Sequence, residues 1–328
     1  MKNENFVTIF FKGLQMYIMN IHKFIMYMSF PILGQLIGLV LIYVPALYMK
    51  DILPQLAQKY EFFDAPSKLI ALLLLAILPG LALFVSAFWK YLITYSSIPS
   101  MTQSAITSGK IYDFPAHEAI VYRNLWTYIL LWLMISILML LAFNPLLIVI
   151  GGIFFIYFIL VFQIFTFESE KGTFGCFKES MSLVKGSFMH TFLLAILLFA
   201  LALGLTYGAE VALTKVFNPT NFIPNFSWQL VSTAIINNFN SQLPLEYQLT
   251  PELISKILFS SMISFIIFGY TLPLRNICWT LWYKNLGGKT SKCEPNNKKK
   301  NNKRKRKVKH ELDPEILRRA YLDDDEEV

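Results

Sequence analysis

Six long apolar stretches constrain the fold of this chain more than any other feature. A helix needs about 20 mainly apolar residues to cross a bilayer. The stretches are roughly Phe24–Tyr48, Lys68–Tyr95, Leu125–Phe143, Pro145–Phe167, Phe188–Leu213 and Ile257–Trp282. The chain is 55% hydrophobic and only 15% charged, whereas soluble domains carry about 25% charged residues. The sequence therefore predicts an all-α integral membrane protein.

The third and fourth apolar stretches are almost continuous. As a single helix, residues 125–167 would be about 65 Å long, roughly twice the hydrocarbon thickness of a bilayer. The chain must therefore turn back, and Asn144-Pro145 is the natural place, because proline at the first position of a helix costs no hydrogen bond. This argument gives six transmembrane helices within a membrane domain that spans residues 1–284.

The distribution of Lys and Arg sets the predicted orientation. With the N-terminus in the cytoplasm, five lysines fall on the outer side and the other 24 of the 29 Lys and Arg residues fall on the inner side. Six spans then return the C-terminus to the cytoplasm. We therefore expect a multi-pass protein of the cell membrane with both termini cytoplasmic.

Short amphipathic segments come before the odd-numbered spans. In CFKESMSLVKGSF and its flanks, the residues Phe174, Phe177, Met181, Val184 and Phe188 recur at helical spacing, which predicts a helix that lies at the membrane surface. Residues 115–126 and 6–24 have a similar layout. This organisation is typical of three consecutive helical hairpins, each preceded by an interfacial helix.

A cation and an aromatic residue mark the point where each of these segments enters its span. Lys185-Gly-Ser-Phe188 aligns with Arg123-Asn-Leu-Trp126, and His22-Lys23-Phe24 is a looser third copy. Lys185, Arg123 and Lys23 are therefore candidates for contact with anionic lipid headgroups. Ordinary anchoring is the simpler interpretation, since aromatic and basic residues collect at membrane interfaces. A ligand or partner surface is the alternative.

Three charged residues fall inside the predicted spans, where charges are costly and often functional. Glu210 lies near the outer end of the fifth span, and Lys90 and Arg275 lie near the inner ends of the second and sixth. We expect these side chains to reach the interface, which removes most of the cost. They are nevertheless the intramembrane candidates for a transporter or permease-like subunit.

No catalytic or metal-binding motif stands out. The three cysteines and four histidines lie far apart and form no zinc or disulfide pattern. His117 and Glu118 are adjacent, but neighbouring helical residues point about 100° apart and so do not form a dyad. We expect no enzyme activity, no cofactor and no metal.

The longest outer connection, residues 214–256, offers little chemistry. The stretch Trp228–Phe239 has apolar residues at helical spacing, which predicts a short surface helix. Thr250-Pro251 is typical of a helix start, with threonine as the cap and proline in the first turn.

The tail 285–328 has a different composition. Its polar, strongly cationic tract predicts disorder, and basic residues just inside a membrane attract anionic lipids. Contact with RNA or the ribosome is the alternative, but the tract lacks aromatic residues for base stacking, so nucleic-acid binding is disfavoured. A protein partner is not indicated by any motif. The lipid candidates here are Lys303, Arg304, Lys305, Arg306 and Lys307.

The segment Phe177-Lys-Glu-Ser-Met-Ser-Leu-Val-Lys-Gly-Ser-Phe188 resembles one in the membrane-domain family named after glycerophosphoryl diester phosphodiesterases, and in related multi-span bacterial proteins. Phe177 replaces the small residue usual there. The resemblance implies a multi-span layout over roughly residues 70–285. The family's catalytic barrel is a separate domain of about 250 residues, which does not fit in this tail. The resemblance therefore implies no phosphodiesterase activity, and the expected role is non-catalytic membrane or envelope organisation.

Overall fold

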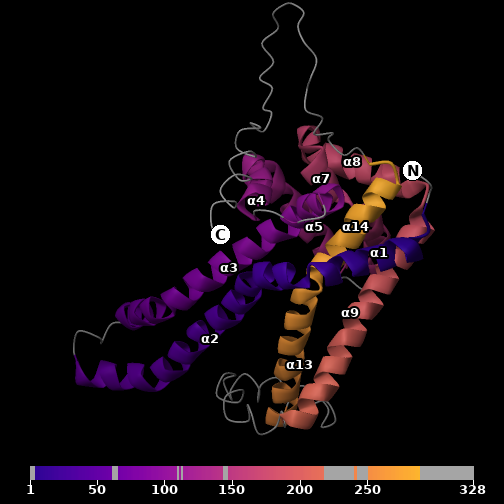
Figure 1. Cartoon of the computed structure of the whole chain (residues 1–328). Coiled ribbons are helices and arrows are strands. Elements are labelled where there is room, and N and C mark those ends of the chain that lie inside the picture. The colour runs from indigo at the N-terminus through magenta and orange to yellow at the C-terminus, as the bar shows by residue number, and fades with distance from the viewer. Residues whose placement is uncertain are drawn as a thin grey trace, which may run out of the picture. The chain divides into compact units, whose positions relative to one another are not determined.

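The computed structural model describes residues 4–60, 66–108, 111, 114–142, 147–217, 240–241 and 250–288. Every regular element in these ranges is helical (Figure 1). The elements are α1 (Phe6–Met19), α2 (Ile21–Lys59), α3 (Pro66–Ser108), α4 (Phe114–Arg123), α5 (Leu125–Ala142), α6 (Ile148–Tyr157), α7 (Val161–Phe167), the 3₁₀ turn η2 (Ser169–Lys171), α8 (Gly172–Lys185), α9 (Phe188–Val216), α13 (Pro251–Tyr270) and α14 (Leu272–Asn285). One compact unit ends at Lys289, and the tail after it lies outside the described residues.

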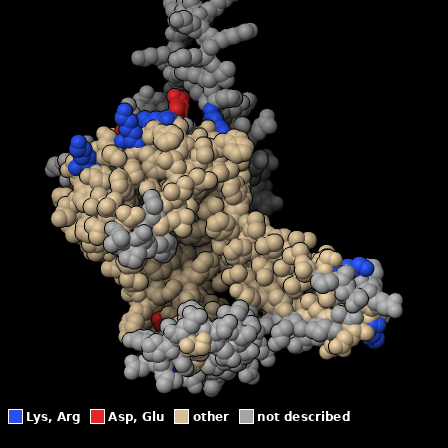
Figure 2. Space-filling model, turned by 180° about the vertical axis from the view of Figure 1, so that it is seen from behind, with Lys and Arg blue, Asp and Glu red and all other residues tan. Residues whose placement is uncertain are grey.

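Within the described ranges, five helical segments are long and apolar enough to cross a membrane. They are Ile21–Ala46, Ser67–Thr107, Ile148–Phe167, Phe188–Val216 and Leu253–Tyr270. The pair α4 and α5, bent by 81° at their join, makes a sixth if it is counted as one span. Figure 2 shows a broad surface band with almost no charged side chains between ends that carry Lys and Arg. The predicted all-α class is confirmed for the described residues, and five or six of the helices could span a membrane by their length and composition.

The second span is longer than predicted. Residues 96–124 were expected to connect two spans, but α3 continues as a helix to Ser108. It does so although Pro99 lies inside it, where proline removes one helical hydrogen bond. The Asn276 side chain of α14 supplies a hydrogen-bond donor in its place.

Glycine residues allow α2 and α3 to pack closely. A β-carbon on Gly38 would lie 2.7 Å from the backbone nitrogen of Phe84, and one on Gly80 would lie 2.6 Å from the backbone carbonyl carbon of Leu41. Gly34, one turn before Gly38, faces Ala87. Small residues on facing helices let the backbones approach in this way.

Short helices precede α2, α5 and α9 in the described structure, as the hairpin organisation predicted. The breaks lie at Asn20, at Asn124 and at Gly186-Ser187. The third predicted copy was out of register, because Lys23 and Phe24 lie in the first turn of α2 rather than at the break. Each short helix packs on the second helix of a hairpin: α1 on α14, α4 on α3, and α8 on α7.

The predicted helix at Phe174–Phe188 is confirmed in outline as α8, but part of its apolar face is covered by protein. Phe177 and Val184, which belonged to the apolar face expected at the headgroup boundary, are buried in the protein together with Cys176 and Ser180. Phe174, which belonged to the predicted apolar face, is 76% exposed. The reason is that α8 packs against α7 on one side, so only part of its apolar stripe faces protein.

The predicted sixth span, Ile257–Trp282, is divided. α13 ends at Tyr270, and α14 starts after a break at Thr271. The helix start predicted at Thr250-Pro251 is confirmed, because the Thr250 hydroxyl accepts a hydrogen bond from the Leu253 N–H at 3.2 Å. At the other end, the Asn285 side chain exchanges two hydrogen bonds, of 2.9 and 3.0 Å, with the backbone of Glu4. These bonds join the start of α1 to the end of α14.

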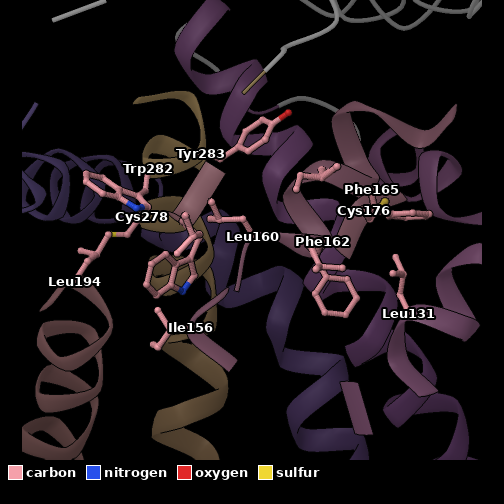
Figure 3. Close-up of a cluster of buried hydrophobic side chains, with 14 of the residues drawn as sticks. Leu131, Ile156, Leu160, Phe162, Phe165, Cys176, Leu194, Cys278, Trp282 and Tyr283 are labelled. Carbon is pink, nitrogen blue, oxygen red and sulfur yellow. The ribbon is translucent and has the colours of Figure 1, made fainter. Parts of the chain in front are cut away.

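The main apolar core lies where α5, α7, α8, α9 and α14 meet (Figure 3). Leu131, Phe165 and Cys176 belong to it, and so do Leu194 and Trp282. The Trp282 indole N–H donates to the Thr191 hydroxyl at 2.9 Å, which ties α14 to α9.

The predicted turn at Asn144-Pro145 and the predicted helix Trp228–Phe239 lie outside the described residues.

Candidate functional site

The candidate site forms around the proline of α3. Pro99 has no N–H, so the carbonyl of Tyr95, four residues earlier, lacks its helical donor. The Asn276 side-chain amide from α14 donates to that carbonyl. The next carbonyl, of Ser96, accepts a hydrogen bond of 3.0 Å from the Thr166 hydroxyl on α7. The Asn276 side chain therefore replaces the missing donor, and Thr166 adds a second bond from α7 to the same turn of α3.

A glutamine joins the two helices that supply these donors. The Gln163 side-chain N–H₂ on α7 donates to the Asn276 side-chain oxygen at 2.8 Å, and both side chains are essentially inaccessible to solvent. We call Tyr95, Ser96, Gln163, Thr166 and Asn276 the polar junction. It is the place where α3, α7 and α14 meet.

Two of the three helices at the polar junction begin directly after a break. α7 follows a break at Phe158–Leu160, and α14 follows the break at Thr271. Interrupted helices free backbone groups that neighbouring side chains must bond in a membrane. Near the polar junction, within the described residues, α7 and α14 thus each follow a break, and α3 is continuous but contains Pro99.

A buried acid lies beside the junction. The Glu118 carboxylate on α4 accepts a hydrogen bond of 2.7 Å from the Tyr27 hydroxyl on α2. Its other oxygen lies 2.6 Å from the Lys90 ammonium on α3. The Glu118 side chain is 9% exposed and that of Lys90 is 34% exposed. This ion pair fixes α4 against the two long helices.

This ion pair was not predicted from the sequence. Lys90 was expected to reach the membrane interface alone, and Glu118 was weighed only with His117. In the structure, Ser100 lies 2.8 Å from His117, so the two neighbours on α4 contact different residues of α3. Lys90 and Glu118 are 28 residues apart in the sequence, so no local sequence pattern indicated that they pair.

A second charged cluster surrounds α8. The Lys171 ammonium lies 2.8 Å from Glu168 and 2.7 Å from Glu179, and the Tyr283 hydroxyl donates to Glu168 at 2.7 Å. Burial alone would lower the pKa of Lys171, but the two carboxylates outweigh it and raise that pKa. Burial also raises the pKa of the Cys176 thiol to about 11. A thiol in this state is a poor nucleophile at neutral pH.

The predicted headgroup contacts fall into different environments. Lys185 and Arg123 are exposed at the last residues of α8 and α4. The Lys23 ammonium instead donates to the Ile111 carbonyl at 2.9 Å. The predicted tail residues Lys303, Arg304, Lys305, Arg306 and Lys307 lie outside the described part of the chain.

The remaining intramembrane candidates lie on the third hairpin. Glu210 on α9 accepts a hydrogen bond of 3.2 Å from Ser260 on α13, so it links the two helices. Arg275 lies in the first turn of α14, and its guanidinium donates to the Phe268 carbonyl at 2.6 Å. The structure brings Arg275 near the polar junction and leaves Glu210 on another part of the hairpin.

No group of three or more His, Cys, Asp or Glu residues within the described ranges is arranged to hold a metal ion. No protein-family model, curated protein or solved structure matches the chain. The interpretation of the site therefore depends on its own geometry.

Proposed function

We propose that this chain is a non-catalytic multi-pass protein of the cell membrane that takes part in membrane or envelope organisation. The observation that carries the proposal is the polar junction. Asn276 and Thr166 each donate a hydrogen bond to a backbone carbonyl of α3, and Gln163 donates to the Asn276 side chain on α14. Their donors are thus committed to holding helices together, which suits a structural role. The resemblance to the phosphodiesterase-associated membrane family agrees with a role that needs no catalytic residue.

The proposal includes an orientation of the chain in the membrane. Short helices and paired lysines gather at the end of the molecule that carries the polar junction, including Lys12, Lys90 and Lys171. Since cytoplasmic segments carry the excess of basic residues, we place this end and both termini in the cytoplasm. A reporter fused after Asn302 that is active only outside the cell would contradict this.

Flux through the purified protein tests the proposed role. In sealed vesicles that contain the full chain, we expect no more release of small dyes or ions than from empty vesicles. In cells that lack the chain, we expect increased entry of a membrane-impermeant dye, which the wild-type chain reverses. Unchanged dye entry would overturn the proposed role in organisation.

Transport of a small molecule is the second candidate. Secondary transporters place their sites at interrupted helices, and such helices meet at the polar junction. In addition, the side-chain oxygen of Gln163 is buried and has no hydrogen-bond partner within the described residues. Solute uptake that requires Gln163 would favour this function over the first.

Contact of the basic tail with anionic lipid is part of the first proposal, and contact with RNA is its alternative. Crosslinking in cells separates the two. Strong, salt-sensitive recovery of RNA through residues 298–309 would favour a membrane-tethered RNA contact.

A further inference from the structure

Arg275 is a half-buried cation with few bonds. Its guanidinium has five N–H donors, and only the bond to the Phe268 carbonyl is made within the described structure. The guanidinium carbon also lies 5.1 Å from the centre of the Phe268 ring. Its Nε atom is buried and has no hydrogen-bond partner among the described residues. Most of the donor capacity of this side chain is therefore unused.

Two other partly buried cations near this end have acidic partners. Lys90 pairs with Glu118, and Lys171 pairs with two glutamates. No Asp or Glu of the described ranges pairs with Arg275. Burying a cation without a counter-charge is costly, so an external anion is the missing partner that the chemistry favours.

Two tyrosines of α3 supply further donors. Tyr91 and Tyr95 pack against the apolar cluster that includes Leu272 and Ile277 of α14, on either side of Arg275 in the sequence. Neither hydroxyl donates to a described residue, and neither side chain is fully buried. A guanidinium fork and phenol hydroxyls are donors that suit the several acceptor oxygens of a phosphate group.

The position of Arg275 along the chain agrees with such a ligand. It lies five residues after Tyr270, where the apolar segment Leu253–Tyr270 ends. A residue about one helical turn beyond the end of an apolar segment reaches the level of lipid headgroups. Figure 1 shows α13 and α14 as consecutive segments that meet there.

We propose that Arg275, with Tyr91 and Tyr95, binds a phosphate group at the break between α13 and α14. The phosphate belongs to an anionic lipid headgroup or to a free phosphate ion. The guanidinium forms the charged hydrogen bonds, and the tyrosine hydroxyls orient the remaining oxygens. Binding at this position would also hold α14 against α3, next to the polar junction.

The test is binding of two probes to the purified full chain in neutral detergent. Native mass spectrometry measures bound phosphatidylglycerol against phosphatidylcholine, and inorganic phosphate in excess serves as competitor. We expect phosphatidylglycerol to bind better than phosphatidylcholine to the wild-type chain. Arg275→Gln should weaken that binding about tenfold or more, and Arg275→Lys should weaken it less. Lys178→Gln removes an exposed cation from α8 and should leave binding unchanged.

A second variant tests the site without disturbing the packing of the fold. Tyr91→Phe combined with Tyr95→Phe keeps both rings and removes only the hydroxyls, so we expect weaker phosphatidylglycerol binding at an unchanged melting temperature. Displacement of lipid by inorganic phosphate would assign the site to free phosphate, and resistance to displacement would assign it to lipid.

Equal binding by the wild-type and Arg275→Gln chains would overturn the proposal. So would binding of neither probe by the wild-type chain. Binding is measured directly here, whereas the role in membrane organisation is measured by dye entry into cells. Failure of the phosphate-site proposal is therefore distinguishable from failure of the proposed role in membrane organisation.

Discussion

Where α2 passes α3, the two backbones are in contact, whereas side chains bridge α3 and α14 at the polar junction. The first contact depends on Gly38 and Gly80, whose missing β-carbons leave room for the opposite chain. The second depends on Asn276, whose amide replaces a donor that Pro99 lacks. One helix, α3, takes part in both contacts.

The two contacts should fail in different ways. Lipid tails are as apolar as the helices, so association in a membrane depends on close packing and on interhelical hydrogen bonds. At the glycine contact, added atoms are harmful because the opposing atoms belong to the backbone and cannot rotate away. At the polar junction, removed atoms are harmful because a buried carbonyl then lacks a donor. Substitutions can test each contact separately.

The largest effect is expected at the glycine contact. Gly38→Val or Gly80→Val places a branched side chain where a single β-carbon would already lie within 2.7 Å of backbone atoms. We expect either variant to lower the free energy of unfolding by about 3 kcal/mol or more, because overpacking forces the helices apart. Unfolding by denaturing detergent, followed by circular dichroism, measures the change.

The matched control is Gly204→Val on α9, because a β-carbon there meets no atom within 4 Å. We expect a change of less than about 0.5 kcal/mol. A cost for Gly204→Val equal to that of Gly38→Val would show that glycine packing is not the cause.

The ion pair beside the junction should give an intermediate and asymmetric effect. Lys90→Met leaves the Glu118 carboxylate buried with only Tyr27 as donor, so we expect a loss of about 2 kcal/mol. Glu118→Gln should cost less, because the partly exposed Lys90 ammonium can reach water. The double variant should cost less than the sum of the two single variants. Additive costs would indicate that the pair does not interact.

The smallest effect is expected at Lys171, whose side chain is 30% exposed. Lys171→Met should lower stability by less than about 1 kcal/mol near neutral pH. Because the folded-state pKa of Lys171 is raised above its ordinary value of 10.5, its contribution is fully present below that pH and is lost as the pH rises through the folded-state pKa. Unfolding measured from pH 7 into the alkaline range should therefore show the two chains converging. A difference that grows with pH would contradict this account.

Local signals in the sequence predicted part of this structure. The apolar lengths predicted the spanning helices, and Thr250-Pro251 predicted the start of α13. The passage of α3 through Pro99 could not be predicted, since it depends on Asn276, which is 177 residues further along the chain. The partner of Lys90 and the burial of part of α8 against protein were missed for the same reason. Each depends on which helix packs alongside, and the periodicity of one segment does not contain that information.

The central claim is that Asn276 completes the backbone of α3 at Pro99, and a double-mutant cycle tests it most directly. Asn276→Ala should cost about 2 kcal/mol in the wild-type chain, because it leaves the Tyr95 carbonyl and the Gln163 amide without partners. Pro99→Ala restores a backbone N–H for the Tyr95 carbonyl. In that background we expect Asn276→Ala to cost about half as much, with the remainder due to Gln163. An equal cost of Asn276→Ala in both backgrounds would contradict the claim.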